Sequence, residues 1–279
     1  MSPGATAARA ARPAAYERLA ALPAWVYLGA LFLASTIIRF AIAAQHPAPF
    51  IFTDELLYGE LAKSFAATGH FALREVAGTA GFGIVYPILL SPAYKLFGDV
   101  PTAYTVMKLI NAVLMSLTAI PTYLLARRLV GRWLALLAAA LTLALPSLLY
   151  AGNIMTENAF FPAFAFWCWA TVVALERPTL RNQLGALALL ALCYFTRPQG
   201  AVLVPALVVA VALVILLDVL SASGSRRDAA VGGLRSFLPT WIALAAVAAL
   251  FLIVQVGVRG KTVGTATLGS YSKIGRAHV

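Results

Sequence analysis

The sequence contains few charged residues. Only 11% of its 279 residues are Asp, Glu, Lys or Arg, and 62% are hydrophobic, whereas an ordinary soluble domain has about 25% charged and about 45–50% apolar residues. A water-soluble globule of this size could neither bury so much apolar surface nor cover itself with so few charges. The composition therefore excludes a cytosolic enzyme, a disordered chain and a nucleic-acid-binding module.

Cysteine is scarce as well, and several common catalytic motifs are missing. Cys168 and Cys193 each lie in an apolar run, which indicates no disulfide framework. The sequence has no Walker-type phosphate loop, GxSxG elbow or dinucleotide fingerprint. The net charge of +11 comes from short basic clusters between long apolar runs, which is the pattern of a membrane protein. The sequence predicts an all-α polytopic membrane protein with no nucleic-acid partner.

Hydropathy predicts about seven spans within residues 23–258, preceded by a basic cytosolic tail over residues 1–22. The fifth predicted span has only about 15 residues, fewer than the roughly 20 that a helix needs to cross the hydrocarbon layer. The predicted spans are residues 23–44, 102–126, 133–151, 157–175, 182–196, 199–220 and 237–258.

The arginines predict the orientation of these spans. With the N-terminus in the cytoplasm, clusters of arginine fall at every second junction and all of them face inward, as the positive-inside rule requires. An even number of crossings must then separate Arg181 from Arg226, so the short fifth segment is expected to cross. The inward-facing arginines are Arg9, Arg12, Arg18, Arg127, Arg128, Arg132, Arg177, Arg181, Arg226, Arg227 and Arg235. The acidic residues expected outside are Asp54, Glu55, Glu60, Glu75, Asp99 and Glu157.

The first outer loop, residues 45–101, is the longest connection, and long connections in compact proteins are usually functional or disordered. This loop has apolar residues at helical spacing: Leu57, Leu61 and Phe65 form one stripe, and Ile84–Phe97 is a second amphipathic stretch. We expect two short helices on the outer membrane surface, joined by a glycine-rich turn over Gly78–Gly83.

Polar residues are densest at the start of this loop, in Thr53-Asp54-Glu55-Leu56-Leu57-Tyr58-Gly59-Glu60. Asp54 and Glu55 would open a helix, where the unpaired N–H groups and the macrodipole favour carboxylates. Alternatively, an ionised carboxylate here accepts a proton from a substrate hydroxyl. Tyr58 lies one helical turn from Asp54 and would join the same site. These residues alone leave both interpretations open.

The loop resembles the first outer loop of the GT-C membrane glycosyltransferases. The similar elements are Asp54-Glu55 with Tyr58, then Gly69-His70-Phe71, then the segment from Tyr86-Pro87 to Phe97-Gly98. The resemblance is to the family 39, protein-O-mannosyltransferase-like group, which includes the aminoarabinose transferases. It covers residues 24–220 as an order of spans and loops, and it is motif-like over residues 53–98.

This resemblance implies a GT-C-type transmembrane helix bundle that moves a sugar from a polyprenyl-phosphate carrier to a hydroxyl acceptor outside the membrane. The acceptor is a polysaccharide, a lipid or a protein. The first acid of the pair, Asp54, is then the general base with Glu55 beside it, and the sugar is inverted. His70, Tyr86 and Tyr58 fall in the motif-like block and are expected to bind substrate.

Two further residues are expected at the same outer surface. Glu157 opens the fourth span and resembles the acidic residue that related enzymes place beside the sugar. It could equally be a helix-start acid. Arg197 lies in a short outer turn, where it could bind the lipid phosphate as a basic residue does in relatives or extend to headgroups. Arg39 and Lys108 are expected to be interfacial anchors.

No metal site is predicted, although His46 and His70 share the loop with carboxylates, so a divalent cation is left open. A transporter or permease is the main alternative function, and a non-catalytic subunit of a cell-envelope assembly is a third. A transporter would place polar groups near the bilayer midplane, whereas these spans have almost no charge at that depth.

The C-terminal residues 273–279, Lys-Ile-Gly-Arg-Ala-His-Val, equal the translation of the start of a common sequencing-library adapter. We therefore expect the natural sequence to end its homology near Ser272, with residues 259–272 beginning an outer segment and the protein continuing beyond a truncated fragment.

Overall fold

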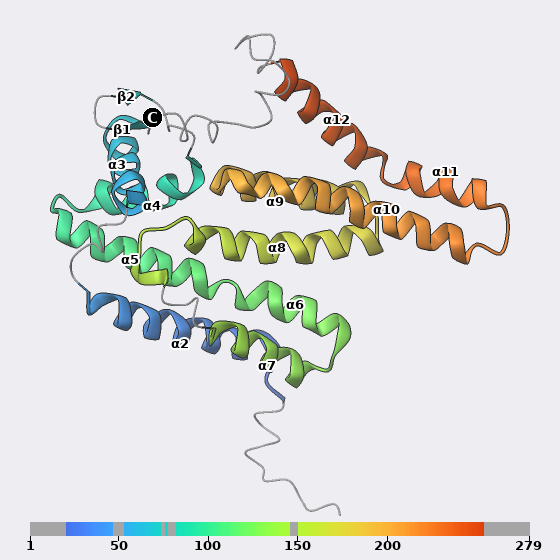
Figure 1. Cartoon of the computed structure of the whole chain (residues 1–279). Coiled ribbons are helices and arrows are strands. Elements are labelled where there is room, and N and C mark those ends of the chain that lie inside the picture. The colour runs from blue at the N-terminus through green and yellow to red at the C-terminus, as the bar shows by residue number, and fades with distance from the viewer. Residues whose placement is uncertain (1–20, 47–52, 74–75, 78–81, 146–149, 254–279) are drawn as a thin grey trace, which may run out of the picture. The chain divides into compact units, whose positions relative to one another are not determined.

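The computed structural model describes residues 21–46, 53–73, 76–77, 82–145 and 150–253 (Figure 1). Two compact units make up the chain: Met1–Trp169 with Phe195–Pro198, and Ala170–Tyr194 with Gln199–Val279. Most of the predicted tail 1–22, the segment 259–272 and the adapter-like residues 273–279 lie outside the described residues, as does Glu75.

The first unit is built around an apolar helix, α2 (Ala24–Ala44), which packs against three others. These are α5 (Val100–Ser116), α6 (Ala119–Leu129) and α7 (Arg132–Leu143). α6 and α7 pack against each other as a tight helical hairpin, visible in Figure 1 as the two green helices at its lower right. Helix α8 (Glu157–Glu176) begins in the same unit.

Two helices in the predicted outer loop confirm that part of the sequence analysis. They are α3 (Thr53–Thr68) and α4 (Val85–Leu96), which pack on each other, and α4 also packs on α5. Buried Tyr58, Leu61, Tyr86 and Leu90 form much of the core between them. Their position on the outer membrane surface stays a prediction.

The loop also contains a short antiparallel pair that the sequence did not predict. Strand β1 (Ala72–Leu73) pairs with β2 (Val76–Ala77), with Ala72 opposite Ala77. Two residues are too few to show the alternation that identifies a strand. Most of the predicted glycine turn, residues 78–81, lies outside the described residues.

Four helical segments among the described residues are long and apolar enough to cross a membrane, which confirms an all-α polytopic membrane protein. They are Ala24–Ala44, Val100–Leu129, Glu157–Glu176 and Pro198–Ser221. A fifth is added if Arg226–Ser236 and Leu238–Leu250, bent by 59°, count as one broken span. Two of the seven predicted spans coincide with shorter helices: α7 with 12 residues, and α9 (Leu180–Thr196) with 17. That these two cross stays a prediction.

The second unit contains most of α9, a short 3₁₀ helix η2 (Pro198–Val202), and three more helices: α10 (Leu203–Ser221), α11 (Arg226–Ser236) and α12 (Leu238–Leu252). α11 packs on α10. The side chain of Gln183 joins α9 to the start of α12. Its amide donates to the carbonyls of Pro178 (2.7 Å) and Ser236 (2.9 Å), and its oxygen accepts from the hydroxyl of Thr240 (2.7 Å).

Gln183 is only 1% exposed, so its replacement should destabilise the second unit. Gln183→Leu leaves the Thr240 hydroxyl and the Ser236 carbonyl buried without their partner, which should cost about 1–3 kcal/mol of unfolding free energy. Detergent-induced unfolding followed by circular dichroism measures the change. Gln183→Glu keeps the oxygen that accepts from Thr240 and should lose less. Wild-type stability in Gln183→Leu would show that the joint is dispensable.

Candidate active site

A buried carboxylate joins the start of α3 to two distant segments. Glu55 is 5% exposed, and its Oε1 accepts a hydrogen bond from the hydroxyl of Tyr104 (3.0 Å) and another from the backbone N–H of Ile154 (2.9 Å). Burying a carboxylate is costly unless hydrogen bonds compensate for the lost water. Glu55 therefore fixes α3 against α5 and against the segment that leads into α8.

A second buried network holds the same segment from the side of α4. The hydroxyl of Tyr86, which is fully buried, donates to Asn111 Oδ1 (2.8 Å). The amide of Asn111 donates to the carbonyl of Asn153 (3.0 Å), and so does the amide of Asn158 (2.9 Å). Burial raises the pKa of Tyr86 well above its ordinary range, so this phenol stays a neutral donor. The network orients the first turn of α8, where Glu157 lies.

Tyr58 lies at the centre of the charged groups that this packing brings together. Its ring packs edge-on against Tyr86, with centroids 5.4 Å apart. Burial, and after it the negative charge of Asp54, raises the pKa of Tyr58 to about 12. A hydrogen bond with Thr156 and the positive charge of Arg197 oppose this shift, whereas the charge of Glu157 adds to it. The phenol therefore remains protonated at neutral pH and offers a donor beside an acid.

Arg197 and Glu157 form an ion pair across 40 residues of sequence. Glu157 lies in the first turn of α8, and Arg197 lies between the end of α9 at Thr196 and the start of η2 at Pro198. Both residues belong to the first unit. The side chain of Arg197 is 34% exposed and that of Glu157 is 16% exposed, so the pair is open to an incoming ligand.

The structure thus separates the predicted site residues. Asp54, Tyr58, Glu157 and Arg197 come together around the Tyr58 phenol, and Asp54 is partly exposed. Glu55 does not face the same way as its neighbour, because consecutive helical residues point about 100° apart. It is held in the interior as an anchor.

Two other predicted residues lie outside this cluster. Tyr86 is fully buried beneath Tyr58 with its hydroxyl engaged, so it supports the site from below. His70 is exposed just beyond the far end of α3, and the 16 residues of that helix span about 24 Å. The structure therefore does not bring His70 to Asp54.

Sequence reasoning did not identify Tyr104, Asn111, Thr156 or Asn158. Asn111 alone carried a usable signal, since an amide within the apolar run of a span is expensive and indicates a specific partner. Thr156 and Asn158 flank Glu157 in the sequence, but their partners come from segments far along the chain.

The two cations expected to be interfacial anchors are both buried. Lys108 is 1% exposed, donates to the carbonyls of Ala43 (3.2 Å) and His46, and lies over the ring of Tyr104 at 4.3 Å. Arg39 is 4% exposed and donates to Ser35 Oγ (2.9 Å) and to the carbonyl of Leu143 (3.4 Å). Both cations join helices within the first unit.

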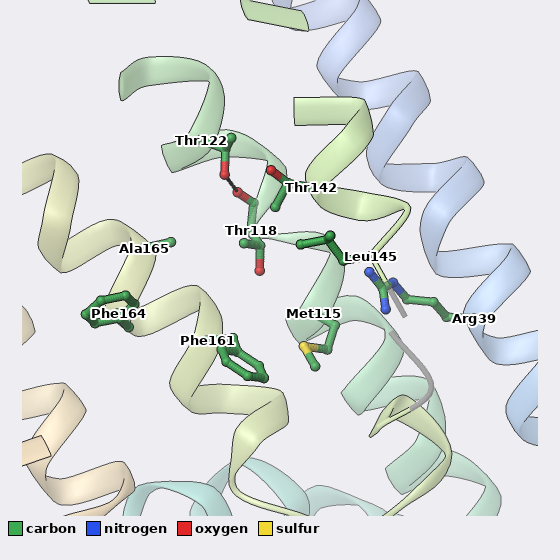
Figure 2. A pocket seen from close by; sticks show the side chains of 9 residues that line it. All are labelled: Arg39, Met115, Thr118, Thr122, Thr142, Leu145, Phe161, Phe164 and Ala165. Atoms are coloured by element: carbon green, nitrogen blue, oxygen red, sulfur yellow. Dashed lines mark hydrogen bonds between the residues drawn. The ribbon is translucent and has the colours of Figure 1, made fainter. Parts of the chain in front are cut away.

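Arg39 also borders a pocket of about 230 Å³ within the first unit (Figure 2). Thr118, Thr122 and Thr142 supply hydroxyls to its lining, and Phe161 lies on the opposite wall. Phe161 is one turn along α8 from Glu157, about 6 Å. The pocket therefore lies just beyond the charged cluster on the same helix. Among the described residues no group of three or more His, Cys, Asp or Glu side chains could hold a metal ion.

Comparison with known proteins supports a glycosyltransferase. A family model described as dolichyl-phosphate-mannose-protein mannosyltransferase matches residues 83–255, well over half of the chain. The matched region includes Tyr86, Glu157 and Arg197, and it begins after α3. No curated protein and no solved structure matches the chain.

The adjacent acids at the start of α3 should differ sharply in their effect on stability. Glu55→Ala removes two buried hydrogen bonds to a charged group and should cost about 1.5–3 kcal/mol or more of unfolding free energy. Asp54→Ala, the matched control, removes a partly exposed first-turn acid and should cost no more than about 1 kcal/mol. Detergent-induced unfolding of both variants makes the comparison. Equal losses would contradict the anchoring role of Glu55.

Proposed function

Because the chain belongs to the dolichyl-phosphate-mannose-protein mannosyltransferase family, and so to the GT-C membrane glycosyltransferases, we propose that it transfers a sugar from a polyprenyl-phosphate carrier to a hydroxyl acceptor. The transfer takes place on the extracytoplasmic side of the cell membrane and inverts the sugar. The observation that carries this proposal is the cluster of Asp54, Tyr58, Glu157 and Arg197 within the first unit.

Asp54 is the general base of the proposed reaction. The acceptor oxygen attacks the anomeric carbon, the bond from that carbon to the phosphate oxygen breaks, and the lipid phosphate leaves with the electron pair. The acceptor proton passes to the carboxylate of Asp54. A phosphate is already a good leaving group, so one base acting on the acceptor can suffice. The partial exposure of Asp54 supports this role, since the acceptor must reach it from outside.

Arg197 and Glu157 hold the donor in this proposal. A guanidinium offers a planar fork of donors that suits a phosphate, and Arg197 is exposed enough to receive one. When the phosphate binds to Arg197, the carboxylate of Glu157 is released from the ion pair and can accept hydrogen bonds from the hydroxyls of the sugar. The neutral Tyr58 phenol donates a hydrogen bond close to Asp54 and steadies its charge.

The other residues first expected to act on substrate take supporting roles. Glu55 and Tyr86 position the cluster through their buried hydrogen bonds. The buried charge beside the pocket, Arg39, is bonded to a serine and to a backbone carbonyl of α7. This arrangement serves helix packing, which favours the enzyme over the transporter.

Replacing Asp54 should remove most of the activity. The full-length protein in proteoliposomes is supplied with radiolabelled polyprenyl-phosphate mannose, and with other polyprenyl-phosphate sugars in parallel. In Asp54→Asn the transfer rate should fall by about 10²–10⁴-fold, the usual contribution of a general base.

Asp99→Asn is the matched control for Asp54→Asn. Asp99 caps α5 by accepting from the N–H of Thr102 (2.8 Å), and asparagine caps a helix almost equally well. This control loses one acid from the same loop and should keep wild-type transfer. Equal rates in Asp54→Asn and wild type would eliminate Asp54 as the base, and solute uptake into the vesicles would favour the transporter.

Replacing Arg197 should weaken donor binding. Arg197→Gln removes a charged hydrogen-bond donor worth about 1.5–3 kcal/mol, so the KM for the polyprenyl-phosphate sugar should rise about tenfold to a hundredfold. The control Arg177→Gln removes an exposed arginine at the turn between α8 and α9. A KM that changes equally in both variants would argue against a phosphate contact at Arg197.

A further inference from the structure

Gly83 lies against the backbone that carries Arg197. A Cβ atom on Gly83 would lie 2.1 Å from the carbonyl oxygen of Thr196 and 2.7 Å from that of Phe195. Non-bonded carbon atoms prefer separations of about 3.5–4.0 Å, so a methyl group cannot be placed there without moving the backbone. Gly83 and this turn belong to the same unit. Only glycine permits so close an approach of these two segments.

Gly83 is fixed from its own side of the contact. The preceding residue, Phe82, packs edge-on against Tyr58, with centroids 5.7 Å apart. On α4, three residues beyond Gly83, Tyr86 is fully buried against the same Tyr58 and is bonded to Asn111. A displacement at Gly83 is therefore resisted by a packed core.

Across the contact, Thr196 is buried and the next residue is Arg197. The contact thus joins the half of the cluster that contains Asp54 and Tyr58 to the turn that carries the guanidinium. Glu157 is held independently, because the hydrogen bonds of Ile154 and Asn158 tie the start of α8 to the core. A shift of the turn would move Arg197 relative to its partner.

We propose that Gly83 is a positioning residue that sets the place of Arg197 relative to Glu157 and Asp54, and hence the site of the donor phosphate. This inference rests on the proposed function. In Gly83→Ala the added methyl group pushes the Thr196–Arg197 turn away, since the aromatic core behind Gly83 gives less readily. The guanidinium then no longer reaches the phosphate in the position from which the sugar reacts.

The test compares Gly83→Ala with Gly59→Ala in the full-length protein. Gly59 is buried in α3, and a Cβ there would meet only the end of the Tyr94 side chain, at 3.5 Å. We expect Gly83→Ala to raise the KM for polyprenyl-phosphate mannose by up to about a hundredfold, the scale of an ångström-sized misplacement. Gly59→Ala should keep the wild-type KM.

A double-mutant cycle distinguishes positioning from a general loss of stability. If Gly83 acts through Arg197, the substitution Gly83→Ala should change the KM little further in the Arg197→Gln background. Additive effects in the cycle, or a lowered kcat with unchanged KM, would overturn the proposal. So would a wild-type KM in Gly83→Ala.

A second measurement does not depend on activity. In protein carrying Glu157→Cys and Arg197→Cys, with Cys168 and Cys193 replaced by alanine, a short bifunctional thiol reagent reports whether the two backbones remain close. We expect the cross-linking rate to fall several-fold when Gly83→Ala is added and to be unchanged with Gly59→Ala. An unchanged rate in Gly83→Ala would refute the positioning role even if sugar transfer itself were disproved.

Discussion

The arrangement of this protein depends on one buried carboxylate. Glu55 accepts hydrogen bonds from Tyr104 and from the backbone of Ile154, residues that lie 49 and 99 positions away from it in the sequence. A charge in the interior requires such partners, so the three segments must meet at this point. Because they meet there, the first turn of α8 lies beside the first turn of α3, and an acid from one end of the chain can work with an acid and an arginine from distant parts of it.

This constraint divides two adjacent acids between two tasks. A helix turns about 100° per residue, so when Glu55 points into the core, Asp54 points towards the rim of the same helix. The interior acid orders the site, and the partly exposed acid remains accessible. Tyr58 is one turn further along and stays neutral because burial and the charge of Asp54 raise its pKa. The Arg197–Glu157 pair completes the cluster with a cation that an anionic ligand can displace.

Local pattern was sufficient for much of the fold. The apolar runs predicted the long helices, and the helical spacing of Leu57, Leu61 and Phe65 predicted α3. The buried face of α3 also includes Tyr58 and Glu55, because α4 and α5 pack against that face and supply partners for its polar groups. The anchoring roles of Lys108 and Arg39 were misjudged for the same reason. A cation near a predicted interface is expected to face lipid headgroups, yet each of these cations meets helix-end carbonyls that only packing brings near.

From the sequence alone came the membrane class, the positions of most helices, the family and the acid-rich start of the outer loop, since hydropathy, helical periodicity and short motifs are properties of neighbouring residues. The tertiary structure decided which acid is buried, which side chain Arg197 pairs with, and how closely Gly83 approaches the turn after α9. These features depend on contacts between segments separated by dozens of residues. Their energies arise only when the helices have packed, so no local pattern can contain them.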